Sequence, residues 1–69
     1  MRILRLKEVI NKTGLARSTI YKYLDAGTFP KPIPLGGRSV GWVDSEIHEW
    51  ILTRIEARDR PHTVMSAVS

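Results

Sequence analysis

The sequence predicts a small, mostly α-helical domain with one β-hairpin, of the winged helix-turn-helix class. Two short helical patterns meet at a tight turn around Gly14, a glycine pair at 36–37 separates two short apolar runs, and a third helical pattern follows. A chain of 69 residues holds one domain at most. We expect residues 1–60 to form this winged helix-turn-helix domain and residues 61–69 to be a flexible C-terminal tail.

The first helix is predicted over residues 6–13, because Leu6, Val9, Ile10 and Thr13 recur at helical spacing. Gly14 then supplies the left-handed conformation that ends a helix. A second helix follows and reaches residue 25 or 26, where Gly27 and the prolines beyond it stop it. An ordinary helical bundle would need a third long helix directly afterwards, and the chain has prolines and glycines there instead.

Residues 33–43 predict a β-hairpin. The glycines at 36–37 allow the positive φ values of a tight turn. Pro34 has no N–H to donate, so its strand is predicted to be an edge strand. Arg38 and Ser39 fall at or beside the tip.

A last helix is predicted to start at Asp44, which we interpret as its N-cap, and to end at Arg60-Pro61. Its buried stripe is predicted from four residues at helical spacing: Ile47, Trp50, Ile51 and Ile55. We expect Trp42 and Trp50 to close the small core between the hairpin and this helix.

The charge distribution favours a polyanionic partner. Residues 1–43 carry eight Lys or Arg against two acids, and residues 44–69 carry three Arg against five acids. The basic half therefore suggests one face directed at nucleic acid, although a solvated basic surface is the plainer interpretation.

Several function classes are disfavoured by the composition. The chain has no cysteine, and His48 and His62 lie far apart, so we predict no metal and no cofactor. Neither a nucleophile–base pair nor paired carboxylates occur at a workable spacing, so we predict that the protein is not an enzyme. The N-terminus has no long apolar run, so we expect a cytoplasmic protein without a membrane partner, and no small-molecule ligand is evident.

The second helix carries the predicted binding residues. On a helical wheel, Ile20 and Leu24 share the buried side, whereas Ser18 and Lys22 point nearly opposite with Thr19 close to them. Small polar side chains in a first turn let a helix enter a major groove, and cations and phenols around them hold phosphates. The predicted contacts on this helix are Arg17, Ser18, Thr19, Tyr21 and Lys22. Tyr23, in contrast, is expected to serve mainly in packing.

The hairpin is interpreted as a wing, which lays basic side chains along phosphates or into a minor groove. Arg38 and Ser39 are its predicted contacts, and Lys31 is predicted as a flanking contact. The glycines at 36–37 are a weak match to a phosphate-binding loop, because neither a Lys-Ser/Thr pair nor a helix follows them directly.

Residues 5–51 resemble the AlpA family of small prophage-type transcriptional regulators. The similarity rests on the joint occurrence of "RLKEV", "TGL-RSTIY", "G-FPKP", "LGGR-VGW" and "SE---WI". The resemblance implies a winged helix-turn-helix related to those of excisionases and MerR-type regulators, double-stranded DNA as the partner, and control of integrase expression or excision. Ala16 departs from the serine common before Arg17 in such proteins, and alanine cannot cap the second helix.

Two alternatives remain open at this point. An excisionase would use the same fold and residues to bend attachment-site DNA. A protein-binding adaptor would instead use Trp42, Trp50 and the Val64-Met65 segment as an apolar contact surface. Self-association on DNA is also left open.

Overall fold

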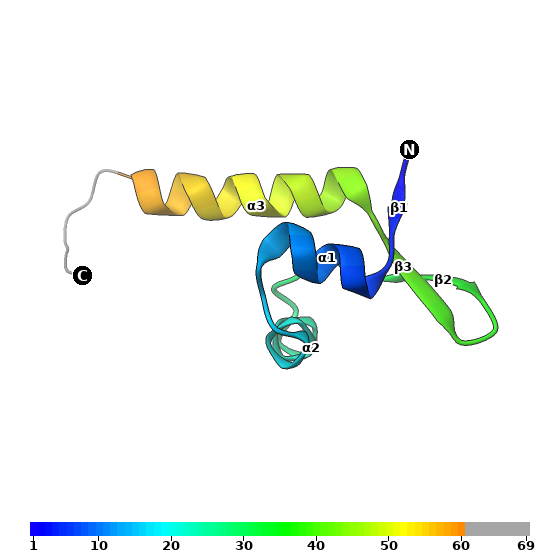
Figure 1. The fold of residues 1–69 in the computed structure, drawn as a ribbon. Coiled ribbons are helices and arrows are strands. Elements are labelled where there is room, and N and C mark those ends of the chain that lie inside the picture. Colours follow the sequence, from blue (N-terminus) through cyan, green and yellow to red (C-terminus); the bar gives the residue numbers. More distant parts are fainter. Residues whose placement is uncertain (61–69) are drawn as a thin grey trace.

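The computed structural model describes residues 1–60, and the expected tail at 61–69 lies outside the described residues. Helices make up most of the described chain, and the strands form one small antiparallel sheet, as predicted (Figure 1). The elements in chain order are β1 Ile3–Leu4, α1 Leu6–Thr13, α2 Arg17–Ala26, β2 Ile33–Gly36, β3 Ser39–Val43 and α3 Asp44–Asp59. This arrangement is consistent with a winged helix-turn-helix.

The first two helices begin and end where the sequence predicts. The carboxylate of Glu8 accepts a hydrogen bond from the backbone N–H of Arg5 at 2.9 Å, which satisfies one free donor at the start of α1. Gly14 has φ of 75° and donates its N–H to the carbonyl of Ile10 at 2.8 Å. Gly27 ends α2 in the same left-handed conformation, with φ of 77°. The chain therefore turns sharply after each helix.

The sheet has three strands, not the two that the sequence predicted. Its order is β1-β3-β2, and β1 pairs antiparallel with β3 through Ile3↔Val43 and Leu4↔Trp42. A strand of only two residues is too short to produce a recognisable alternation, which explains why it was not predicted. The predicted edge position of β2, with its Pro34, is confirmed.

The hairpin turn lies one residue later than predicted. Gly36 still pairs with Ser39, so the turn consists of Gly37 and Arg38. The register shifts between Pro34 and Gly36, which leaves Leu35 as an extra residue in a β-bulge. Arg38 is thereby placed at the tip of the hairpin.

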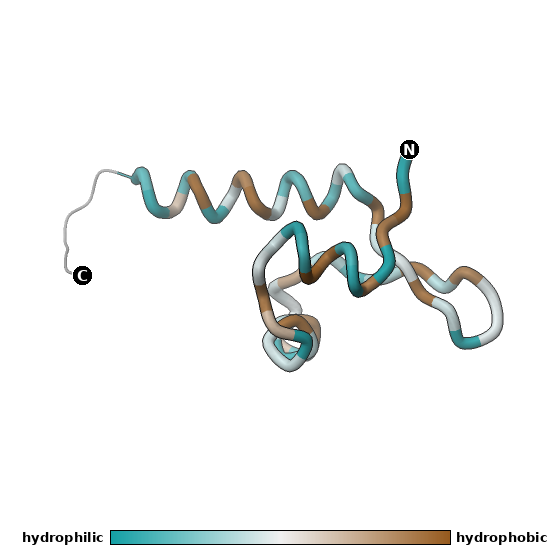
Figure 2. Tube along the Cα trace, viewed as in Figure 1, coloured by the Kyte–Doolittle hydropathy of each residue, from teal (hydrophilic) through white to brown (hydrophobic). Residues whose placement is uncertain are grey.

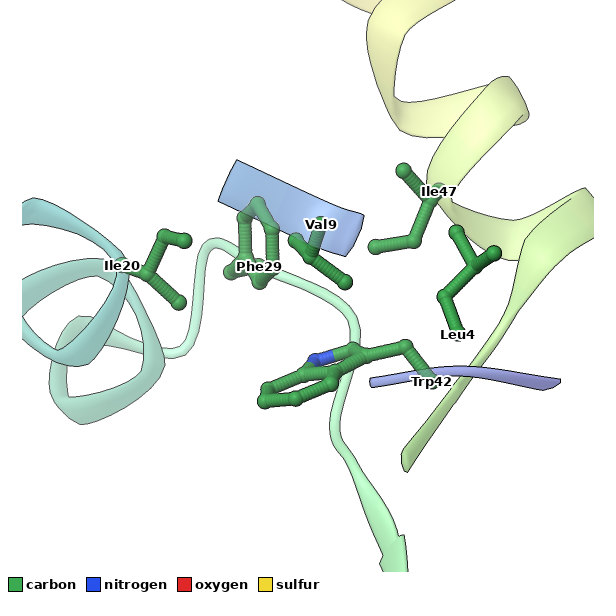
Figure 3. Packing of buried hydrophobic residues seen from close by; sticks show 6 residues of the cluster. All are labelled: Leu4, Val9, Ile20, Phe29, Trp42 and Ile47. Carbon is green, nitrogen blue, oxygen red and sulfur yellow. The ribbon is translucent and has the colours of Figure 1, made fainter. Parts of the chain in front are cut away.

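The hydrophobic core is small and takes one side chain from each element except β2, together with Phe29 from the segment between α2 and β2 (Figure 3). Its buried members are Leu4, Val9, Ile20, Phe29, Trp42 and Ile47. Trp42 is 1% exposed and packs among them, whereas Trp50 is only partly buried at the border of the cluster. The expectation that the two tryptophans close the core is therefore met fully by Trp42 and in part by Trp50.

Two predictions for the last helix are wrong. Asp44 is the first helical residue and not the cap; Val43 occupies the cap position, without a side-chain hydrogen bond. Ile55 is 40% exposed and not part of a buried stripe. The reason is geometric: within residues 1–60, the shorter helices α1 and α2 cover Ile55 only in part, at a hollow that it shares with Leu15 and Tyr23.

The C-terminal part of α3 projects beyond the other helices (Figure 1). Every residue from Leu52 to Arg60 is exposed. Hydrophobic and hydrophilic residues nevertheless continue to alternate along this part (Figure 2). Leu52 and Ile55 are therefore hydrophobic side chains that stay largely exposed.

Candidate nucleic-acid interface

The N-terminus of α2 is uncapped. Ala16 is the N-cap residue, with extended backbone angles and no side-chain hydrogen bond, and the first turn contains no acid. Its backbone carbonyl accepts a hydrogen bond from the N–H of Ile20 at 3.1 Å, so the helix starts directly after it. Among residues 1–60, no side chain caps the first N–H groups of α2, which carry the positive end of the helix dipole.

The outward face of α2 is polar and open. Arg17, Ser18, Tyr21 and Lys22 are exposed, whereas Ile20 on the opposite side is fully buried. Ser18, Tyr21, Lys22, Leu24 and Asp25 line one shallow surface hollow. The structure therefore brings three of the five helix residues predicted from the sequence, Ser18, Tyr21 and Lys22, together at one hollow, and Arg17 is exposed one turn before Tyr21.

Thr19 and Tyr23 lie at the border of that surface. Thr19 is half-buried, which leaves it less accessible than Ser18 beside it. Tyr23 is also half-buried, and its ring centroid lies 6.2 Å from that of Trp50. This contact places Tyr23 among the packing residues, as expected from the sequence.

The hairpin presents Arg38 at its tip. Arg38 is exposed in the turn, and Ser39 is half-buried at the start of β3. In Figure 1 the hairpin turn and α2 both lie on the side of the molecule away from α3.

Lys31 occupies a different surface. It lines a hollow that also includes Glu46 and Glu49 of α3. The structure does not bring Lys31 together with the α2 residues, and the two glutamates make its immediate surroundings less basic than the sequence suggested.

The segment between α2 and β2 is fixed by two indole groups. The Nε1–H of Trp50 donates to the carbonyl of Thr28 at 2.8 Å, and the Nε1–H of Trp42 donates to the carbonyl of Pro30 at 2.9 Å. The side chain of Phe29, between these two carbonyls, is 5% exposed. Sequence reasoning missed both hydrogen bonds; the only available signal was that a buried indole usually finds an acceptor.

The cations of the candidate face are not engaged elsewhere within the described part of the chain. The ion pairs among residues 1–60 are Arg2–Glu8, Lys12–Asp44 and Arg58–Asp59. None of them includes Arg17, Lys22 or Arg38, so these three charges remain available for phosphates. Within the same residues, no group of three or more His, Cys, Asp or Glu side chains could hold a metal ion, and no helix is long and apolar enough to cross a membrane.

The fold and the candidate site define a class: a small, mostly helical protein with an exposed polar helix face and a basic hairpin tip. Comparison with known families makes this more specific. The family model described as prophage CP4-57 regulatory protein (AlpA) matches residues 2–55. The chain belongs to the AlpA family, as its resemblance indicated.

Two relatives illustrate the family. The chain is 52% identical over 60 residues to the DNA-binding transcriptional activator AlpA of Escherichia coli strain K12, an alignment covering 78% of this chain and 86% of that protein. It is 46% identical over 59 residues to the uncharacterized protein ORF88 of Enterobacteria phage P4, covering 86% of this chain and 67% of that protein.

Proposed function

We propose that this protein is a sequence-specific DNA-binding transcriptional regulator of an integrated mobile element, and that it controls integrase expression or excision. The observation that carries the proposal is the exposed face of α2, which includes Arg17, Ser18, Tyr21 and Lys22. Among residues 1–60, neither Arg17 nor Lys22 forms an ion pair. Membership of the AlpA family and the activator from E. coli support it.

In the proposed mechanism the protein acts as a winged helix-turn-helix. The N-terminal turn of α2 enters the major groove, where Ser18 and Thr19 hydroxyls meet base edges. Arg17, Tyr21 and Lys22 hold the phosphates beside the groove, and the uncapped N–H groups of α2 favour an anion there. No covalent chemistry is involved; occupancy of the site recruits or blocks the transcription machinery.

The hairpin provides the second proposed contact with DNA. Arg38 at its tip lies along the phosphates or in the adjacent minor groove, with Ser39 beside it. Lys31 is proposed only as a more distant flanking phosphate contact, because it lies outside the α2 face and beside Glu46 and Glu49. Self-association is proposed only on DNA, where two copies on neighbouring sites would contact each other.

The test is footprinting on the DNA that flanks the gene of this protein and any neighbouring integrase gene. A discrete protected site, with specific binding at least about 10³-fold tighter than binding to scrambled DNA, is the expected result. Uniform, sequence-independent protection would contradict the proposal of specific regulation, and absence of binding even at low salt would favour an adaptor that binds protein.

The position of the footprint separates regulator from excisionase. Protection upstream of the integrase gene, together with altered reporter expression, supports transcriptional control. Protection inside an attachment-site arm, with bending of the DNA and no effect on the reporter, would instead assign the protein to excision proper.

A further inference from the structure

We propose that Trp50 is a positioning residue for DNA recognition: its indole fixes the segment that connects α2 to the hairpin, and with it the angle between the two elements proposed to contact DNA. This inference rests on the proposed function. It concerns a residue of α3, outside the face assigned to DNA.

The connecting segment, residues 27–32, has no helix or strand of its own. It is held instead at two carbonyl groups two residues apart. Trp50 donates to the carbonyl of Thr28 at 2.8 Å, and Trp42 donates to that of Pro30 at 2.9 Å. Because one indole comes from α3 and the other from β3, the segment is tied to both the last helix and the hairpin.

Trp50 also contacts α2 itself. Its ring centroid lies 6.2 Å from that of Tyr23 and 4.9 Å from that of Phe29, with an edge-on angle of 65° to Phe29. The backbone N–H of Thr28 donates to the carbonyl of Tyr23 at 2.9 Å. One side chain therefore touches the last turn of α2 and, through Thr28, the first residues after it.

The two indoles differ in what their removal does. Trp42 is 1% exposed and central to the core, so its replacement opens a cavity. Trp50 is only partly buried, and it is not one of the residues proposed to touch DNA. A change in DNA selectivity on altering Trp50 would therefore report the placement of α2 and the hairpin, because no DNA contact is removed.

The experiment compares Trp50→Phe with wild type on the footprinted duplex and on a scrambled duplex, by fluorescence anisotropy at fixed salt. Phenylalanine keeps an aromatic ring near Phe29 and Tyr23 but has no N–H for the Thr28 carbonyl. We expect the ratio of specific to nonspecific affinity to fall about tenfold, while nonspecific affinity stays within about twofold, because phosphate contacts tolerate a changed angle better than base contacts do.

The matched control is Ile51→Val, which loosens the packing of α3 against the core at the neighbouring position but leaves both indole hydrogen bonds in place. This variant should have a lower thermal stability but an unchanged ratio of specific to nonspecific DNA affinity. If circular dichroism shows that Trp50→Phe does not fold, the chain is made by chemical synthesis with a benzothiophene in place of the indole, which keeps the shape and removes only the N–H.

Equal losses on both duplexes, or the same fall in ratio for Ile51→Val, would overturn the inference and leave Trp50 with a purely structural role. The outcome is distinguishable from failure of the proposed function. A wild-type protein without sequence preference would reject the proposed function, whereas a selective wild type with an equally selective Trp50→Phe variant would reject only the positioning role.

Discussion

The Nζ of Lys12, in the last turn of α1, donates a hydrogen bond to Oδ1 of Asp44, the first residue of α3. The backbone N–H of Asp44 in turn donates to the carbonyl of Arg2 at 2.8 Å. Asp44 therefore joins the start of α3 to α1 and to the N-terminal strand region. The hydrogen bond and the charge of Lys12 lower the pKa of Asp44 below its ordinary value of 3.8, with smaller contributions from Arg2 and His48.

This ion pair predicts an acid-sensitive contribution to stability. Because the pKa of Asp44 is lower in the folded than in the unfolded protein, the contribution is complete above about pH 3.8 and is lost as the pH falls through the folded value. Asp44→Asn should therefore flatten the decline of thermal midpoint below about pH 4, measured by circular dichroism from pH 2 to 7. Glu56→Gln, which changes an exposed acid further along α3, is the control; equal flattening in both variants would contradict the prediction.

The missing cap of α2 predicts a stabilising substitution. Ala16→Ser should raise the free energy of unfolding by up to about 1 kcal/mol, because a serine hydroxyl can accept a hydrogen bond from a free N–H in the first turn. For a domain of this size that amounts to roughly 4–8 °C in the thermal midpoint. Ala26→Ser, at the last residue of the same helix, is the control and should not stabilise. An unchanged midpoint for Ala16→Ser would mean that other groups already satisfy these donors.

Arg38 at the hairpin tip predicts a specific change in salt dependence. Binding should weaken with salt by about 0.9 in log K per unit of log salt concentration for each neutralised phosphate. Arg38→Ala should reduce the slope by about that amount and leave the preference for the footprinted site largely intact. Arg54→Ala removes the same charge from α3 and should keep the wild-type slope. Identical slopes for wild type and Arg38→Ala would exclude the hairpin tip from the DNA interface.

Replacing Ser18 should weaken DNA binding only at the specific site. Ser18→Ala should weaken binding to the footprinted duplex by about 1–3 kcal/mol and leave binding to scrambled DNA nearly unchanged, because the phosphate contacts remain. Ser45→Ala, an equivalent change at an exposed serine of α3, should affect neither duplex. Thr19→Ala should additionally lower stability, because its side chain is half-buried. Equal losses on both duplexes for Ser18→Ala would show that this serine positions the backbone and does not read bases.

Gly41 in the middle of β3 predicts a steric conflict. A Cβ at this position would clash with Cγ2 of Ile3 and lie 3.0 Å from Cδ1 of Leu35, residues of the two strands that flank β3. Gly41→Ala should therefore destabilise the protein by about 1–3 kcal/mol in urea unfolding. Adding Ile3→Ala should recover part of the loss, so that the double variant is less destabilised than the sum of the single ones. Simple additivity would show that Ile3 does not cause the conflict.

Local rules predicted the helical part of the fold because its signals are local. Gly14 and Gly27 mark both helix ends, and the spacing of the apolar residues in α1 marks its buried side. The pairing of β1 with β3 joins residues about forty positions apart, and no short pattern encodes it. The exposure of Ile55 depends on the lengths of the neighbouring helices, which its own spacing does not contain.

The candidate site also has parts that local sequence patterns predict and parts that they do not. Membership of the exposed α2 face follows from helical geometry, so Ser18 and Lys22 could be placed from the sequence. The surroundings of Lys31 could not, because Glu46 and Glu49 approach it from a helix that lies later in the chain. The hydrogen bond from Trp50 to Thr28 joins residues 22 positions apart and is likewise invisible to local reasoning.

Because α3 projects beyond the other helices, the part of the protein that unfolds as one cooperative unit should end within α3. The amides of α3 from Ile47 to Ile51 are hydrogen-bonded within the helix beside the core and should exchange with deuterium mainly through global unfolding, whereas those after Leu52 should exchange through fraying of an otherwise unsupported helix. A helix segment this short gains little from its own hydrogen bonds in water. The boundary of protection should therefore fall inside a single continuous helix, about two turns before its last residue.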